Sequence, residues 1–437
     1  MVLFLISLIL PFLFHIGPML MSANRLVLAA MVLPCVGLWM RGRAGRVRTA
    51  DIALLMMWGW ITLSFVVLEG VGPTIEPSGI RFIETIGAYF LARCFIRNAD
   101  GFHAMVKVLF WIIALMLPFS IYETLTGVDV PMQLANRLWE ADDIVWKEAR
   151  WGLDRVQGLF SHPILYGVFC GGATALTYYV LGYRASAFGR TLKTTIVSVS
   201  VMLSLSSGPL TALIAQLALI GWDRVLNPIR QRWVILAGSV AALYMLVELA
   251  ANRSAAKIFI AYFAFDSWTA SNRLRIWDYG TQSVANFPLF GIGHGDWVRP
   301  EWMSSSMDMF WLVSAVRNGL PAALFLQLAF FSLFLTIAFK SGLSERVSRY
   351  RTGYLLCMIG FFLGGWTVDY WKTIYVFFMF LLGSGVWILD ADGQEDSPSK
   401  PGTQADTARR IGYSRPRETI PTTYSRRPPV PSTQRSP

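Results

Sequence analysis

Apolar runs of about twenty residues recur along the whole chain, separated by short polar segments. A bilayer core is about 30 Å thick, so an α-helix needs roughly 20 apolar residues to cross it. Backbone groups that face lipid must be satisfied within their own segment, which favours helices for these runs. The sequence therefore predicts an all-α polytopic membrane protein with about 12 transmembrane helices, at 2–20, 24–40, 51–70, 79–96, 103–123, 163–183, 194–207, 209–223, 233–250, 311–339, 352–369 and 373–389.

The composition agrees with this class and excludes several others. Charged residues make up 15% of the chain, against about 25% in soluble domains, and the mean hydropathy is +0.48. A disordered chain, a coiled coil, a disulfide scaffold and an ordinary cytosolic enzyme are excluded. The seventh and eighth runs are separated only by Ser206-Ser207-Gly208-Pro209. This break fits either a tight hairpin or the tip of a re-entrant pair.

Basic residues in the short loops predict the orientation. Four clusters follow the second, sixth, eighth and tenth runs, and they agree on cytoplasmic termini with the longer loops 124–162 and 251–310 outside. The clusters explain most of the net charge of +11, so no nucleic-acid partner is expected. Residues 391–437 are rich in proline and arginine. This composition predicts a disordered cytoplasmic tail. The basic clusters are Arg41, Arg43, Arg46 and Arg48; Arg184, Arg190 and Lys193; Arg224, Arg230 and Arg232; and Lys340, Arg346, Arg349 and Arg351.

Both longer loops mix tryptophans with charged residues. An aromatic belt at the membrane interface is one explanation. A sugar-binding surface is the other, because pyranose C–H faces pack on aromatic rings while the hydroxyls need polar partners. The tryptophans in or beside the loops are Trp139, Trp146, Trp151, Trp268, Trp277, Trp297, Trp302 and Trp311.

Arginines on the same side indicate anion binding. The planar guanidinium matches phosphate oxygens in a bidentate way. Arg155, Arg273 and Arg275 lie where loop meets membrane, and Arg81 lies just inside the outer end of the fourth run. A charge within a membrane segment is costly, which makes Arg81 a functional candidate. A structural pair with Glu84, three residues further on, is the alternative.

Several motifs in these loops resemble those of the bacterial O-antigen ligase and polymerase superfamily, which includes exopolysaccharide polymerases. The resemblance covers roughly residues 70–390. Two departures stand out: the arginine that usually follows Ser207 is missing, and Asp308-Met309 replaces a His-Asn pair. The motifs are Arg155-x-x-Gly158-x-Phe160-x-His162-Pro163; Ser204-Leu-Ser206-Ser207-Gly208; Asn272-Arg273-x-x-Ile276-Trp277 with Pro288-Leu-Phe-Gly291-Ile-Gly293; and Asp308-Met-Phe-Trp-Leu312 with Arg317-Asn-Gly319-Leu-Pro321.

The resemblance implies a glycosyltransferase-C-like fold in the bacterial inner membrane, with residues 1–390 as the catalytic domain. It implies transfer of an oligosaccharide from undecaprenyl pyrophosphate to a sugar hydroxyl at the periplasmic face, without a metal or other cofactor. A polymerase of lipid-linked repeat units is the first hypothesis. An O-antigen ligase acting on lipid A core and a non-enzymatic flippase or transporter are the alternatives. Partners would be membrane lipid and a chain-length regulator or flippase.

The expected site combines acid–base groups with anion-binding groups. Asp308 is the first choice as general base and His294 the second, although a helix N-cap for Asp308 and a plain turn for His294 are the alternatives. His162 could equally cap or orient the sixth helix. The expected substrate-binding residues are Arg81, Arg155, His162, Arg273, Arg275, Trp277 and Asp296.

Overall fold

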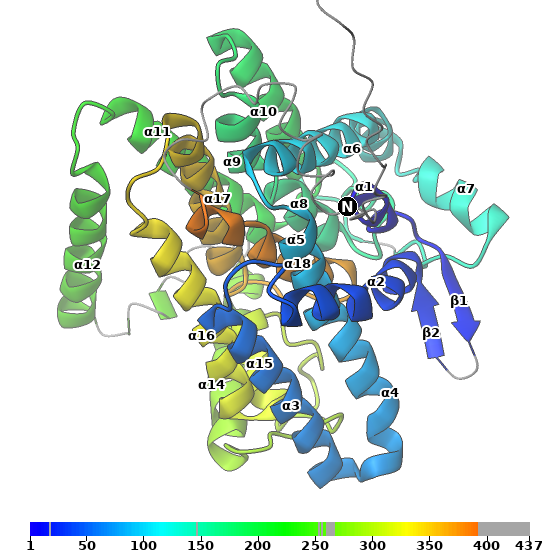
Figure 1. The fold of residues 1–437 in the computed structure, drawn as a ribbon. Helices are drawn as coiled ribbons and strands as arrows, with labels where there is room; N and C mark the ends of the chain where they lie inside the picture. Colours follow the sequence, from blue (N-terminus) through cyan, green and yellow to red (C-terminus); the bar gives the residue numbers. More distant parts are fainter. Residues whose placement is uncertain (17–18, 146, 252–253, 255–256, 259–266, 392–437) are drawn as a thin grey trace, which may run out of the picture. The chain divides into compact units, whose positions relative to one another are not determined.

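The computed structural model describes residues 1–16, 19–145, 147–251, 254, 257–258 and 267–391, and the predicted tail lies almost wholly outside them (Figure 1). Contacts group residues 1–393 into one compact unit. The described part is helical apart from one short hairpin. Six helical segments are long and apolar enough to cross a membrane: 23–40, 49–69, 99–126, 163–181, 232–250 and 320–338. A multi-pass membrane protein follows from these segments.

The first predicted span is wrong. Helix α1 covers only Val2–Ser7, about 9 Å at 1.5 Å per residue, which is too short to cross a bilayer. Strands β1 (Leu13–Ile16) and β2 (Met19–Ser22) follow as an antiparallel hairpin in which Leu13 pairs with Ser22. Pro11 lies between the helix and the hairpin and has no backbone N–H for helical bonding.

The other elements of the amino-terminal half correspond to predicted spans or to the first long loop. They are α2 (Ala23–Met40), α3 (Thr49–Glu69), α4 (Val71–Phe82), the π-helix η1 (Ile83–Gly87), α5 (Ala88–Phe95), α6 (Ala99–Thr126) and α7 (Val130–Leu138). Because α4, η1 and α5 run on without a break, the fourth span contains a π-helical turn. Such turns are frequent at functional sites.

The carboxyl-terminal half continues the same pattern. Its elements are α8 (Pro163–Gly171), α9 (Thr174–Leu176), the π-helix η2 (Thr177–Leu181), α10 (Ala187–Leu203), α11 (Ser207–Val225), α12 (Arg232–Ala250), α14 (Ser267–Asn286), α15 (Phe310–Asn318), α16 (Leu320–Ala338), α17 (Glu345–Gly364), α18 (Thr373–Ser384) and the 3₁₀-helix η3 (Val386–Leu389). The seventh and eighth runs form α10 and α11, which are joined by a tight turn of only three residues, 204–206, as both the hairpin and the re-entrant interpretation require.

The tenth predicted span is broken at Gly319, which separates α15 from α16. Its φ of +83° lies in the left-handed region, and a Cβ there would lie 1.9 Å from the carbonyl oxygen of Leu289. The neighbouring backbones are bonded: Gly293 N donates to Arg317 O at 2.9 Å, and Leu320 N donates to Pro288 O at 2.8 Å. The 288–293 and 317–321 motifs therefore meet, and glycine permits the close approach.

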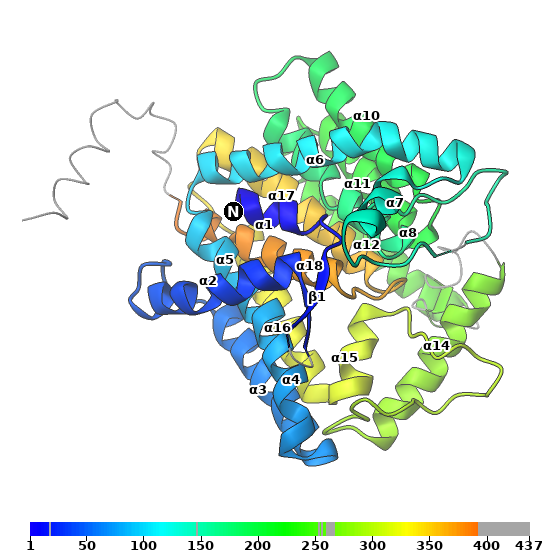
Figure 2. The ribbon, with the colours of Figure 1, turned by 90° about the vertical axis from the view of Figure 1, so that its right-hand side faces the viewer.

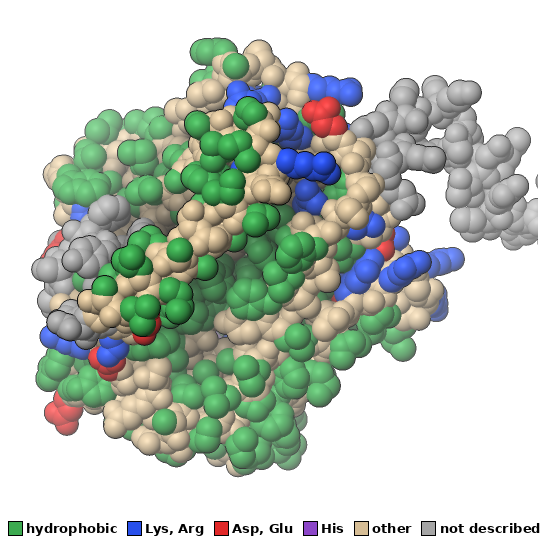
Figure 3. All heavy atoms as spheres, turned by 90° about the vertical axis from the view of Figure 1, so that its left-hand side faces the viewer, with side chains coloured by type: hydrophobic (Ala, Val, Ile, Leu, Met, Phe, Trp, Pro, Cys, Tyr) green, Lys and Arg blue, Asp and Glu red, His purple; other side chains and the backbone are tan. Residues whose placement is uncertain are grey.

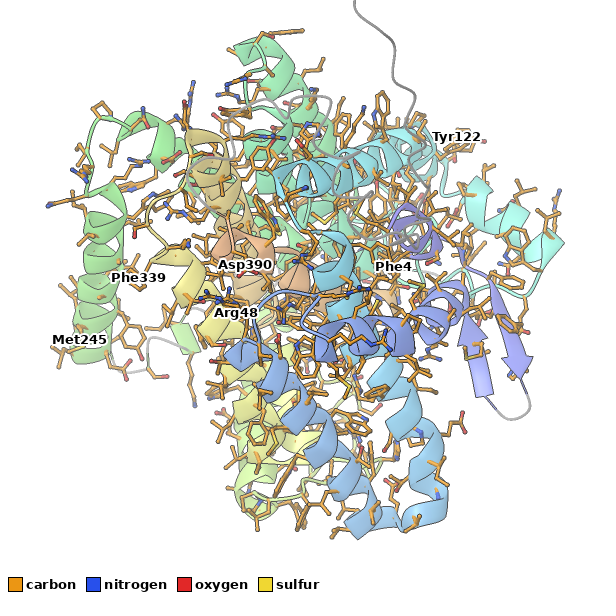
Figure 4. All side chains as sticks on the ribbon, in the orientation of Figure 1. Phe4, Arg48, Tyr122, Met245, Phe339 and Asp390 are labelled. Carbon is orange, nitrogen blue, oxygen red and sulfur yellow. The ribbon has the colours of Figure 1, made fainter. Side chains whose placement is uncertain are left out.

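Two of the basic clusters are bonded to other segments of the chain. Arg48 forms an ion pair with Asp390, and Figure 4 labels both residues. Arg93 Nη2 donates to the carbonyl of Ala44 at 3.0 Å, and Arg346 pairs with Asp100 at 2.6 Å. Figure 3 shows one face of the molecule, where hydrophobic side chains predominate and Lys and Arg gather toward one side. This separation is typical of a protein embedded in a bilayer.

Candidate functional site

Three arginines converge on the turn between α10 and α11. Arg155 Nη2 donates to the Ser206 hydroxyl at 2.9 Å, and Arg273 Nη2 donates to the Ser207 hydroxyl at 2.8 Å. Arg150 Nη1 donates to the carbonyl of Leu205 at 2.7 Å. We call Arg150, Arg155 and Arg273 the serine-turn cluster. Two of its members come from the first long loop and the third from α14, so the turn gathers residues distant in sequence.

The turn between α10 and α11 contains a strained residue and leads directly into the long helix α11. Leu205 has a φ of +43°, which is uncommon for a residue with a side chain. Ser206 is the N-cap of α11, and Ser207 is its first residue. The first N–H groups of a helix are unsatisfied and carry a partial positive charge, which attracts anions. The serine-turn cluster adds three full charges at this helix end.

A buried carboxylate holds the first long loop in place beside the turn. Glu123, near the end of α6, accepts hydrogen bonds from Gln157 N at 2.7 Å and Gly158 N at 3.0 Å. Val156 N donates to the carbonyl of Leu203 at 3.1 Å, which ties the loop to the end of α10. On the other side of Arg155, Asp154 N donates to the carbonyl of Thr124 at 3.1 Å, so the backbone is held on both sides of the arginine.

Burial and mutual repulsion perturb the cluster. Burial, with the neighbouring charge of Arg150, lowers the pKa of Arg155 to about 10. Burial likewise lowers the pKa of Arg273 to about 10, although the Asp308 carboxylate opposes this shift. Arg155 Nε is also buried without a hydrogen-bond partner among the described residues. Concentrated cations that remain charged at neutral pH favour a bound anion.

The Asp308 carboxylate influences both the serine-turn cluster and a second polar region. It acts electrostatically on Arg273 and also on Asp369. One of its oxygens accepts a hydrogen bond from the Ser306 hydroxyl at 2.8 Å. The N-cap explanation for Asp308 is wrong, because α15 begins at Phe310 and its N-cap is Met309.

His162 has a capping role. Its Nδ1 accepts a hydrogen bond from Ile164 N at 3.1 Å, at the N-cap of α8. Burial and the charges of Lys147 and Arg155 lower its pKa to about 3. The ring also lies edge-on to Trp371, with centroids 5.7 Å apart. His162 is therefore neutral and orients the sixth helix, which is the structural alternative raised by the sequence.

Asp369 lines a polar cavity of about 350 Å³. Helices α3, α4 and α15, which lie together in Figures 1 and 2, contribute to its wall with the loop at 369–372. Its charged lining residues are Arg25, Arg81, Glu84, Arg317, Asp369 and Lys372, and His294 also lines it. We call this space the polar cavity.

The ion pairs around the polar cavity differ from those predicted. Glu84 pairs with Arg25 at 2.8 Å, whereas the Arg81 guanidinium lies over the ring of Tyr375, 4.6 Å from its centroid. His294 Nδ1 lies 2.8 Å from Glu69, and its backbone N–H donates to the same carboxylate at 2.9 Å. His294 is thus held in place by a carboxylate at the end of α3, and is more than a plain turn residue.

Three further predicted residues from the second long loop have other partners: Arg275 and Asp296 within the loop, and Trp277 just after α17. The Arg275 guanidinium lies 4.9 Å from the ring centroid of Trp302, and Asp296 pairs with Arg299 at 2.7 Å. Trp277 contacts the ring of Trp366 at a centroid distance of 5.8 Å. The structure does not bring these residues into the serine-turn cluster or the polar cavity lining.

The tryptophan surface is only partly available to a sugar. Trp297 and Trp311 are buried, with 2% and 4% of their surface exposed, so the sugar-binding interpretation is wrong for both. Trp151 and Trp302 are exposed. Trp146 and the side chain of Trp268 lie outside the described residues.

Three residues at the polar cavity were not predicted from the sequence: Arg317, Asp369 and Lys372. Arg317 lay within a quoted motif but was assigned no role, and Asp369 was placed inside a span. The available signal was the segment Asp369-Tyr-Trp-Lys372, a polar interruption between two apolar runs on the predicted outer side. Burial, with the charge of Asp308, raises the pKa of Asp369 to about 7.

Comparisons with known proteins add no relative. No family model matches the chain, and no curated protein matches it. Within the described ranges, no group of three or more His, Cys, Asp or Glu side chains is placed to hold a metal ion. The features of the described residues that bear on function are therefore the serine-turn cluster, Asp308 and the polar cavity.

Proposed function

We propose that this protein polymerises oligosaccharide repeat units linked to undecaprenyl pyrophosphate, at the periplasmic face of a bacterial inner membrane. The observation that carries the proposal is the convergence of three guanidinium groups on the turn that opens α11. A departing lipid diphosphate gathers negative charge as its bond to the sugar breaks. Preorganised cations at that position stabilise the transition state.

The reaction needs a base beside this anion site. The acceptor hydroxyl oxygen attacks the anomeric carbon, the bond from that carbon to the diphosphate oxygen breaks, and the hydroxyl proton goes to a carboxylate. Asp308 is the proposed base, because it acts electrostatically on Arg273 in the serine-turn cluster and on Asp369 in the polar cavity. These two interactions connect Asp308 to the proposed donor site and to the polar cavity.

The proposed orientation places this site outside the cytoplasm. The basic loops that meet around Arg48 and Arg93 would face the cytoplasm under the positive-inside rule. Residues 124–162 and 251–310 would then face the periplasm, where a chain-length regulator or flippase could reach them. Reporter fusions within these two loops test the proposal, and cytoplasmic signals from both would contradict it.

Lipid-linked intermediates in a deletion strain test the reaction. If this protein is a polymerase, single repeat units on undecaprenyl pyrophosphate should accumulate in the deletion strain. Accumulation of full-length lipid-linked chains would instead indicate a ligase, and unchanged lipid-linked pools would contradict both enzymes. Complementation with the wild-type chain should restore polymer.

The same strain tests the base. Asp308→Asn keeps the shape of the side chain and removes its basicity, so transfer should fall by about 100-fold or more. Arg224→Ala, which changes an exposed arginine near the end of α11, is the matched control and should retain activity. Equal protein levels in the membrane must accompany both variants. Wild-type polymer from Asp308→Asn would exclude Asp308 as the base.

A further inference from the structure

The polar cavity has a charge balance that the donor diphosphate does not explain. Two of its cations already have acidic partners: Arg25 pairs with Glu84 at 2.8 Å, and Lys372 pairs with Asp142. Arg81 and Arg317 form no ion pair within 4.0 Å among the described residues, and both act electrostatically on Asp369. With Asp369 ionised, the cavity keeps one net positive charge.

The cavity also contains an unused hydrogen-bond donor. Asn318 is 6% exposed, and its Nδ2 has no hydrogen-bond partner among the described residues. It lines the cavity beside Arg317. A buried amide without a partner costs free energy unless a ligand or water satisfies it. This donor is a second observation, independent of the arginines, that points to a polar ligand.

Aromatic rings complete the wall. Tyr370, Trp371 and Tyr375 all line the cavity, and the Arg81 guanidinium is fixed over the Tyr375 ring. Stacking holds the plane of this guanidinium, and a hydrogen bond with the Tyr375 side chain fixes it further. Its remaining N–H groups are the donors for a ligand. A space of about 350 Å³, with apolar rings, an amide and two guanidinium groups, has the features of a small-ligand site.

We infer that the polar cavity binds the acceptor sugar through a carboxylate, so that the acceptor is an acidic sugar such as a uronic acid. Its role as the acceptor rests on the proposed function, whereas the binding itself does not. Arg81 and Arg317 hold the carboxylate, Asn318 donates to a sugar oxygen, and the rings contact the C–H face. Asp308 acts electrostatically on Asp369 in the cavity wall, and it is the proposed base for the acceptor hydroxyl.

A monoanion fits this cavity better than a second diphosphate does. One carboxylate neutralises the single excess positive charge, whereas a diphosphate carries at least one further negative charge close to Asp369. Like charges at short range disfavour one another strongly in a partly buried site. The diphosphate of the acceptor also lies at the far end of its repeat unit, away from the hydroxyl that reacts.

Equilibrium binding tests the inference without requiring turnover. The full-length protein in nanodiscs is titrated with methyl glucuronide, methyl glucoside and methyl glucoside 6-phosphate. We expect the glucuronide to bind about 10-fold or more tightly than the glucoside, since charge-assisted bidentate bonds are strong. Equal binding of glucuronide and glucoside would overturn the inference. Tighter binding of the phosphate would overturn the carboxylate assignment.

Variants locate the preference within the cavity. Arg81→Gln and Arg317→Gln should each remove most of the preference for the glucuronide, whereas Arg81→Lys should restore part of it. Arg224→Gln is the matched control for charge, and it should keep the wild-type preference. An unchanged preference in both glutamine variants, with normal thermal unfolding, would place the sugar elsewhere and overturn the inference.

A transfer assay separates this inference from the proposed function. If a lipid-linked donor reacts with neutral and acidic acceptors at equal KM, the proposed function stands and the inference fails. If no acceptor reacts while the glucuronide still binds selectively, the proposed function fails and the carboxylate site stands. The expected result is a lower KM for the acidic acceptor, which Arg317→Gln raises toward the neutral value.

Discussion

Arg93 and Arg155 are both partly or fully buried arginines, but their surroundings differ. Arg93 pairs with Asp51, and this carboxylate also accepts hydrogen bonds from Tyr89 at 2.7 Å and Trp39 at 3.0 Å. Arg155 donates to a neutral serine, and two further arginines lie at the same turn. The same residue type is thus neutralised at the basic-loop end and concentrated at the opposite loops. An arginine that is neutralised by a carboxylate stabilises the fold, whereas arginines concentrated at one turn favour the binding of an anion.

The largest expected effect is the loss of stability when the buried ion pair between Arg93 and Asp51 is broken. Arg93→Ala leaves the buried Asp51 carboxylate without its ion pair, which should cost about 3–5 kcal/mol of unfolding free energy. Thermal unfolding of the purified protein in detergent measures this loss. Arg41→Ala, in the exposed part of the same basic loop, should unfold like wild type. If Arg93→Ala were as stable as the wild type, the interpretation of Arg93 as a stabilising residue, in contrast to Arg155, would be wrong.

The opposite result is expected for Arg155. Arg155→Ala should lower transfer by about 100-fold, as for the loss of one charge-stabilising donor, while thermal unfolding changes little. Polymer length and single-turnover transfer measure the first effect. Arg275→Ala sharpens the comparison, because Arg275 stacks on Trp302 instead of reaching the turn, and it should lose less activity. A strongly destabilised Arg155→Ala protein would make Arg155 a structural residue.

A smaller effect is expected from Asp369, whose pKa is raised to about 7 by burial and by the charge of Asp308. Below pH 7 the protonated carboxyl leaves Arg81 and Arg317 uncompensated, and above pH 7 the carboxylate offsets one of them. The Kd for methyl glucuronide should therefore rise by up to about 10-fold between pH 6 and pH 8. Asp369→Asn should flatten this dependence. If the Kd for methyl glucuronide depended on pH in the same way in the wild type and in Asp369→Asn, a group other than Asp369 would be responsible for the pH dependence.

The smallest effect is expected at the turn itself. Ser206→Ala removes the acceptor for Arg155 Nη2 and keeps the charge, so it should cost about 1 kcal/mol in transition-state stabilisation. Transfer should then fall by about fivefold, measured as kcat/KM for the lipid-linked donor. A loss as large as that of Arg155→Ala would show that the serine contributes beyond positioning.

The apolar runs predicted most helices correctly because hydrophobic length is a local property. The failures have local causes that only tertiary contacts reveal. The run at 2–20 forms α1 and a hairpin, and the run at 311–339 breaks at Gly319 because the 288–293 segment packs against it. Neither partner segment is visible in the apolar pattern.

The candidate site was predictable by residue type and only partly by position. Arg155 and Arg273 do meet at one turn, and Asp308 acts electrostatically on Arg273, whereas the roles that their motifs indicated stay predictions. Asp369 and Arg317 were missed because their importance depends on the polar cavity, and a cavity exists only when separate helices meet. His162 was assigned to substrate, whereas the N–H groups at the start of α8 use its ring nitrogen.

The amino-acid sequence alone determined that this chain belongs in a membrane. The length and apolar character of each run can be read from the run itself, without knowing which segments pack beside it. It also determined which loops carry the arginines. Only the tertiary structure decided which arginines are neutralised and which are gathered around an open polar space. The energy of a charge depends on the atoms within a few ångströms of it, and residues far apart in the chain supply those atoms.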